Sequence, residues 1–152
     1  MMPTLAQPEV LEVARRTAQF ILAAMLAIVA GTAAASDWQP VATSESGTYS
    51  MDFASLVRDG TVVRAWVRIT LNKPMDGPAG IKVLSARSRQ YFDCENRRWA
   101  HKQSTFYADK QFEKVARDGE EVEDALLDWN QIPPDHANEI LLEVACAKAP
   151  PK

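Results

Sequence analysis

The sequence predicts an α+β protein: an antiparallel β-sheet of about five or six strands with a C-terminal α-helix tied to it by one disulfide. Three observations predict this fold. Several runs alternate apolar and polar residues with the period of two of a half-buried strand, and turn residues separate them. One helical pattern follows Pro133-Pro134 near the C-terminus. The two cysteines, Cys94 and Cys146, lie in a predicted strand and in that helix.

Residues 1–35 have the pattern of a secretory signal peptide. Arg15 and Arg16 supply the positive charge, Phe20–Ala30 is an uncharged apolar run, and Ala33–Ala35 offers a small-residue cleavage site. The run is short and Ala-rich for a membrane span of about 20 residues. We therefore expect contact with the membrane only through the signal peptide before its cleavage. An uncleaved anchor and a twin-arginine signal are the alternatives.

Cleavage leaves residues 36–152 as one exported domain without a cysteine for a lipid anchor. The formal net charge of −3 provides no general attraction to nucleic acid. In an oxidising compartment Cys94 and Cys146 are expected to form a structural disulfide. A zinc site with His101 and His136 is the alternative, but the spacings fit no zinc finger. No metal or other cofactor is therefore expected.

The first strands are predicted from short runs around turn residues. Trp38–Val41 and Thr48–Phe53 are strand candidates. Asp52 is then expected to cap a single turn over residues 54–56. Asp59-Gly60 is a strong turn signal before the next strand.

Thr61–Leu71 is the clearest strand. One face carries Val63, Ala65, Val67, Ile69 and Leu71, and the other carries Arg64, Arg68 and Thr70. Asn72–Gly80 contains two prolines and two glycines and is predicted to be a loop.

Lys82–Cys94 and Arg97–Tyr107 are predicted to form a hairpin joined at Glu95-Asn96. A two-residue turn places Phe92 opposite Trp99 and Asp93 opposite Arg98, and it places Arg89 opposite Lys102. A three-residue turn would shift this register. Gln111–Arg117 is expected to add another strand.

The terminal helix is predicted over His136–Ala147, with Asp135 as its cap. Its apolar stripe is expected to consist of Ala137, Ile140, Leu141 and Val144. Cys146 lies about half a turn from that stripe. Either the last turn loosens, or Leu142 and Cys146 form a second contact edge.

No catalytic set is evident in the sequence. His101 and His136 lack a Gly-x-Ser-x-Gly nucleophile or another marked partner, and there is no glycine-rich phosphate loop. The acidic segment 120–124 lacks the ligand pattern of an EF-hand and is expected to be a solvated loop. The sequence therefore predicts a protein that is not an enzyme.

A basic strip is the best candidate for partner binding. It consists of Arg87, Arg89, Arg98 and Lys102, which the predicted register places on one sheet face. Such a strip suits an anionic polysaccharide or an acidic patch on a protein. The alternative is the solvated outside of a sheet, on which Asp93 and Glu113 offset part of the charge.

The order of motifs along the chain resembles the surface-adhesin protein E-like domain family. Residues 49–60 match its pattern Y-x-x-D-x-x-S-[IL]-x-R-x-G, residues 89–107 resemble its R-x-Y-x-x-x-C and T-x-F-Y hairpin, and residues 129–146 resemble its final element. The resemblance implies an antiparallel sheet with a disulfide-tied C-terminal helix. It also implies an envelope protein that dimerises and binds extracellular-matrix proteins of a host.

Two other functions compete with an adhesin at this stage. The first is a soluble periplasmic housekeeping or stress protein without a host partner, so both the periplasm and the outer surface are candidate locations. The second, less favoured, is a periplasmic ligand-binding or hydrolytic protein, which a deep apolar pocket would support.

Overall fold

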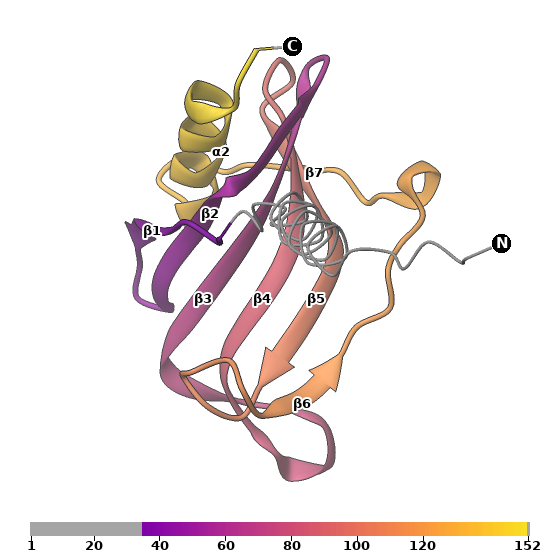
Figure 1. Ribbon diagram of the computed structural model, residues 1–152. Coiled ribbons are helices and arrows are strands. Elements are labelled where there is room, and N and C mark those ends of the chain that lie inside the picture. Colours follow the sequence, from indigo (N-terminus) through magenta and orange to yellow (C-terminus); the bar gives the residue numbers. More distant parts are fainter. Residues whose placement is uncertain (1–34, 152) are drawn as a thin grey trace, which may run out of the picture. The chain divides into compact units, whose positions relative to one another are not determined.

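The computed structural model describes residues 35–151, so nearly all of the predicted signal peptide lies outside the described residues. The strands are β1 (Trp38–Thr43), β2 (Gly47–Asp59), β3 (Val62–Asp76), β4 (Lys82–Asp93), β5 (Arg98–Tyr107), β6 (Val115–Asp118) and β7 (Asn130–Gln131) (Figure 1). The helices are the 3₁₀ turns η2 (Pro78–Gly80) and η3 (Asp124–Leu126) and the α-helix α2 (Ala137–Lys148).

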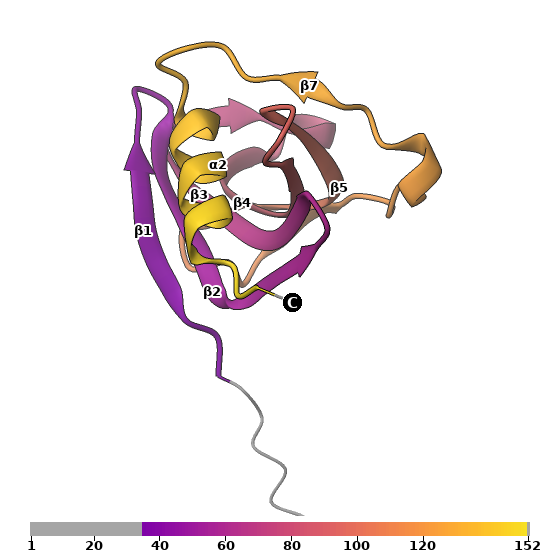
Figure 2. The ribbon, with the colours of Figure 1, turned by 90° about the horizontal axis from the view of Figure 1, so that it is seen from above.

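The strands form one antiparallel sheet in the order β1-β2-β3-β4-β5-β6, and β7 also pairs with β5. Each strand on this path lies beside the next one in the sequence, so the topology is built from local connections. The helix α2 lies across one face and contacts β1 to β5 (Figure 2). The prediction of an antiparallel sheet with one C-terminal helix is confirmed.

The predicted turn over residues 54–56 is wrong, because β2 continues through it to Asp59. The pairing of β2 with β3 is irregular between Asp52 and Val57. Asp52 Oδ1 accepts hydrogen bonds from the backbone N–H groups of Asp37, at 2.7 Å, and Ala54, at 3.1 Å. The carboxylate thus satisfies local backbone donors, as a helix cap would, but within a distorted strand.

The predicted loop 72–80 is also partly wrong, because β3 extends to Asp76. Pro74 lies where the pairing with β4 is interrupted, between Thr70 and Met75. A proline has no N–H group to donate to a neighbouring strand, and here the ladder needs none. The expected strand Gln111–Arg117 is shorter than predicted, since β6 begins only at Val115.

The hairpin of β4 and β5 has the predicted register near its turn, with Phe92 opposite Trp99 and Asp93 opposite Arg98. The register shifts between Arg89 and Gln90, so that Arg89 lies opposite Gln103. The prediction that Arg89 lies opposite Lys102 is therefore wrong. One bulge residue between the two halves of the hairpin is sufficient to shift the pairing.

The core lies between α2 and the sheet face that we call the inner face. Leu141, Leu142 and Ala145 are at most 2% exposed and pack against residues such as Phe92 and Met51. The predicted stripe is rotated, because Ile140 is 43% exposed. The helix cap is His136, whose Nδ1 accepts the N–H of Asn138 at 3.2 Å, and Asp135 precedes it.

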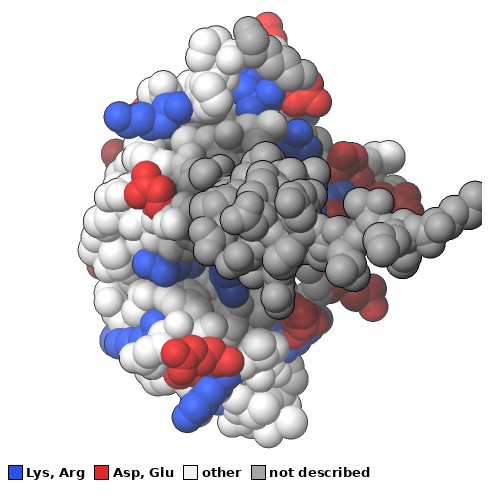
Figure 3. Space-filling model, viewed as in Figure 1, with Lys and Arg blue, Asp and Glu red and all other residues white. Residues whose placement is uncertain are grey.

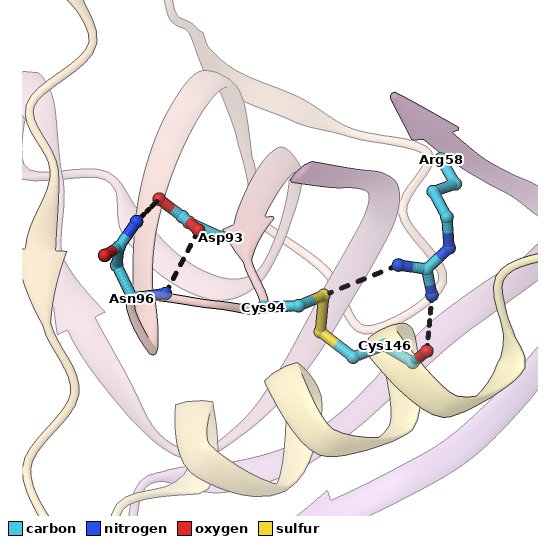
Figure 4. Close-up of a disulfide and its surroundings, with 5 residues drawn as sticks. All are labelled: Arg58, Asp93, Cys94, Asn96 and Cys146. Atoms are coloured by element: carbon cyan, nitrogen blue, oxygen red, sulfur yellow. Dashed lines mark hydrogen bonds between the residues drawn. A yellow bond between two sulfur atoms is a disulfide. The ribbon is translucent and has the colours of Figure 1, made fainter. Parts of the chain in front are cut away.

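The disulfide Cys94–Cys146 joins the end of β4 to the last turn of α2, with 5.9 Å between the Cα atoms (Figure 4). The helix stays regular through Cys146, and Leu142 is buried, so the second contact edge is the alternative that the protein adopts. Arg58 Nη2 donates a hydrogen bond to the Cys146 carbonyl at 2.5 Å. An arginine thus binds a carbonyl at the negative end of the helix dipole, beside the cross-link.

Candidate binding surface

The outer face of the sheet, opposite α2, carries the arginines of the central strands. On β3 the inner residues Val63, Ala65 and Val67 are buried in the core. Alternation along the strand therefore directs Arg64, Trp66 and Arg68 to the outer face. Their partners on β4 are Tyr91, Arg89 and Arg87. Arginines and aromatic rings thus share the outer face of the two central strands.

Arg68 and Arg87 lie directly opposite each other on β3 and β4. The Arg68 guanidinium carbon is 4.5 Å from the centre of the Trp38 ring and 5.1 Å from that of Phe112. Arg87 Nη2 donates a hydrogen bond of 2.6 Å to the hydroxyl of Tyr107. Both guanidinium groups are thus held by aromatic residues.

Arg89 forms an ion pair with Glu121, and its guanidinium lies 5.8 Å from the centre of the Trp66 ring. Its charge is therefore balanced from within the chain. The acidic segment 120–124 is exposed, as the sequence predicts, and Glu121 also pairs with Arg89 of the basic strip.

Lys102 is the residue at the β4–β5 irregularity, and it is only 7% exposed. Its Nζ lies 2.5 Å from Asp124 Oδ1 and 3.7 Å from Glu121 Oε1. The hydrogen bond with Asp124 raises the pKa of Lys102 and lowers that of Asp124. The ammonium group is thus bound by the acidic segment of the same chain.

Arg98 pairs with Asp93 at 3.0 Å, which confirms the predicted cross-strand contact. Its guanidinium also lies 5.0 Å from the centre of the Trp129 ring. Burial raises the pKa of Asp93, but hydrogen bonds from Asn96 and Arg98 outweigh it and lower the pKa below its ordinary value. The pair stabilises the end of the hairpin beside Cys94.

The structure therefore divides the basic strip. Arg89, Arg98 and Lys102 each form an ion pair with a carboxylate of the same chain, whereas Arg87 forms none among the described residues. Sequence reasoning placed Arg68 on the polar face of its strand but did not connect it with Arg87. Among the described residues visible in Figure 3, basic and acidic side chains are interspersed.

The inner face contains a cavity of about 450 Å³ beyond the start of α2. Its wall is mostly apolar and includes Tyr49, Ile69, Leu71, Trp99 and Phe106. The cavity forms because α2 covers only one end of the long strands. Its volume is in the range of small-molecule sites.

The two histidines lie apart from any cluster of metal ligands. His101 packs edge-on against Trp99, with 4.4 Å between the ring centres, and His136 caps α2. Within residues 35–151, no three His, Cys, Asp or Glu side chains are grouped to hold a metal ion. No helix in this described part is both long and apolar enough to cross a membrane.

Comparisons with known proteins find matches of two kinds. The family described as "Surface-adhesin protein E" matches residues 38–147. A structure of Haemophilus influenzae protein E aligns with a TM-score of 0.54 at 16% identity, covering 76% of this chain and 88% of that chain. A second crystal form aligns with a TM-score of 0.55 at 16% identity, covering 76% and 91%.

Protein E from non-typeable Haemophilus influenzae aligns with a TM-score of 0.52 at 16% identity, covering 76% of this chain and 79% of that chain. No curated protein matches the sequence. At this identity the structural likeness shows a common fold. The matched residues run from the start of β1 almost to the end of α2.

Proposed function

Because this chain belongs to the surface-adhesin protein E family, we propose that it is an exported, non-enzymatic binding protein of the bacterial cell envelope that attaches to a partner outside the cell. The match to the family over residues 38–147 is the observation that carries this proposal. The proposed partners are extracellular-matrix proteins of a host or an acidic polysaccharide. The signal-peptide pattern before the domain supports export.

The outer face supports binding through charge. It presents Arg87 and Arg89 among aromatic rings, a combination of residue types that is enriched in protein interfaces. Arg89 forms an ion pair with Glu121, whereas Arg87 donates a hydrogen bond to the hydroxyl of Tyr107. We therefore assign Arg87 the larger part in binding a partner, and Arg98 and Lys102 a smaller one.

Location is the first test of this proposal. An epitope tag after residue 152 should be reached by antibody or protease on intact cells if the protein acts at the outer surface. A periplasmic protein carrying the same tag serves as the control for intact membranes. If the tag is protected until the outer membrane is broken, the adhesin role is wrong and a periplasmic function without a host partner replaces it.

Charge reversal is the second test. Arg87→Glu should weaken binding to immobilised matrix proteins, and the loss should diminish as salt is added. Arg117→Glu is the matched control. Arg117 lies opposite Phe106 in the pairing of β5 with β6, and Phe106 lines the inner cavity, so Arg117 is on the inner face of the sheet. Equal effects of the two variants would contradict binding through the outer face.

A ligand-binding function is the second candidate, and the inner cavity of about 450 Å³ is the observation that favours it. Native mass spectrometry of the protein purified after export would reveal a retained small molecule. A mass equal to that of the polypeptide alone, together with binding of matrix proteins, would exclude this candidate in favour of the adhesin.

A further inference from the structure

Two neighbouring arginines on the outer face have no carboxylate of their own. Arg68 and Arg87 lie opposite each other, and among residues 35–151 neither forms an ion pair. Arg89 and Arg98, by contrast, pair with Glu121 and Asp93. Like charges directly opposite each other on adjacent strands are destabilising. The fold therefore holds two positive charges side by side where an anion would relieve their repulsion.

The two guanidinium groups are held in place before any anion arrives. Trp38 and Phe112 both contact the guanidinium of Arg68, and the Tyr107 hydroxyl accepts two hydrogen bonds from Arg87, at 2.6 and 3.3 Å. Holding the groups in place lowers the entropy that binding would otherwise cost.

The local charges compensate the pair only in part. Burial, followed by the positive charge of Arg87, lowers the pKa of Arg68, and the negative charge of Asp52 opposes this shift only in part. Asp52 Oδ1 already accepts hydrogen bonds from two backbone N–H groups. Among the described residues, no ion pair joins this carboxylate to Arg68.

A cavity of about 220 Å³ opens at this point, lined by Trp38, Arg68, Arg87, Gln111 and Phe112. It has room for one compact anionic group rather than for a long chain. Guanidinium groups bind planar and tetrahedral oxyanions through paired hydrogen bonds, and the Gln111 side chain adds a further polar group.

We propose that Arg68 and Arg87, flanked by Trp38 and Phe112, bind one sulfate group of an acidic polysaccharide. This inference rests on the proposed function and names the chemistry by which the outer face would recognise its partner. The sulfate would lie between the two guanidinium groups, and the sugar ring would pack against the aromatic side chains.

The position of the cavity favours a saccharide over an acidic peptide. Arg68 and Arg87 lie on central strands, whose backbone groups are engaged by neighbours on both sides. A peptide that binds to a sheet usually gains affinity from main-chain hydrogen bonds at a free edge. A sulfated saccharide needs only the two cations and the aromatic side chains of Trp38 and Phe112.

The test uses the protein purified after export and a fully sulfated heparin-derived hexasaccharide, with binding measured by calorimetry. Arg68→Gln and Arg87→Gln should each raise Kd about tenfold, the loss expected for a hydrogen bond to a charged group. Arg117→Gln removes the same charge from the opposite face and should change Kd less than about twofold. The hexasaccharide stripped of sulfate should not bind.

Arg68→Lys and an NMR titration keep the test independent of folding. Lysine retains the charge but loses the guanidinium fork, so Arg68→Lys should fall between wild type and Arg68→Gln. In the wild-type protein, the Trp38 indole N–H resonance should shift with the same Kd. If Arg68→Gln and Arg87→Gln behave like Arg117→Gln, or if the indole does not respond, the proposal is wrong.

Binding of a glutamate-rich peptide, measured in the same way, tests whether the anionic groups come from an acidic protein. If that peptide binds more tightly than the hexasaccharide and with the same dependence on Arg68, the partner is an acidic protein and the polysaccharide proposal is overturned.

Failure of this inference is distinct from failure of the proposed function. An accessible tag, together with hexasaccharide binding that is unchanged in Arg68→Gln and Arg87→Gln, would contradict the inference alone. A protected tag with hexasaccharide binding at this pair would contradict the surface role and support the anion site.

Discussion

Removing the Cys94–Cys146 disulfide should lower the free energy of unfolding by about 4 kcal/mol. The two cysteines are 52 residues apart, and the chain-entropy cost of closing a loop of that length in the unfolded chain is about 4 kcal/mol at 25 °C. The effect is expected to be global, because a helix of 12 residues is marginal by itself and depends on its packing against the sheet.

The perturbation is the double variant Cys94→Ala/Cys146→Ala, compared with wild-type protein under oxidising and reducing conditions. Urea unfolding followed by circular dichroism yields both the free energy and the slope m. The slope should increase without the cross-link, because the unfolded chain then exposes more surface. Reduced wild-type protein retains both sulfur atoms in the core contact, so it isolates the effect of the bond from that of side-chain packing.

Two results would refute this reasoning. A loss below about 1 kcal/mol in the double variant would mean that the cross-link does not restrict the unfolded chain as the loop length requires. Equal stability of oxidised and reduced wild type, with only the double variant destabilised, would assign the effect to packing of the sulfur atoms.

Three further changes test the packing of the helix and the end of the hairpin. Arg58→Met removes the hydrogen bond to the Cys146 carbonyl and should lower the free energy of unfolding by about 1–2 kcal/mol in the same urea assay; an unchanged midpoint would mean that water replaces the guanidinium without loss. Leu141→Ala creates a cavity at a position that is 0% exposed and should lower the free energy of unfolding by about 2–5 kcal/mol. Ile140→Ala, on the exposed side of α2, should lower it by less than about 0.5 kcal/mol. A larger loss of stability in Ile140→Ala would mean that Ile140 belongs to the buried stripe, as the sequence predicts. The pKa of Asp93 is lowered in the folded protein, so its stabilising effect is complete above its ordinary pKa of about 4 and is lost as the pH falls through the lower folded-state value. Asp93→Asn should therefore be less stable than wild type near neutral pH, and the gap should narrow in acid; a gap independent of pH would contradict an ionised role for this carboxylate.

The strands were predictable because alternation is a local property of the chain. Val63, Ala65 and Val67 are buried as the period of two requires, and the turn at Glu95-Asn96 predicts the pairing of Phe92 with Trp99. Errors occurred where a local signal had two structural solutions. Pro74 favours a loop in the sequence, but the structure accommodates it in β3 where the ladder is interrupted.

The helix illustrates the same limit. Its existence and approximate ends follow from the prolines before it and from its apolar residues, but the buried side does not. Ile140 is exposed and Leu142 is buried, because the disulfide and the sheet decide how α2 is rotated about its axis. A helical wheel that has apolar residues on two sides does not show which of the two sides packs against the sheet.

By itself, the sequence determined the approximate positions of most strands and of the helix, which side chains of Thr61–Leu71 share a strand face, and which two cysteines are linked. The tertiary structure decided the composition of the basic surface. It placed Arg68 opposite Arg87 through the register of β3 and β4, and it brought Glu121 and Asp124 onto Arg89 and Lys102. Alternation needs only one strand, whereas register across a bulge and the docking of a distant acidic loop depend on contacts between segments far apart in the chain.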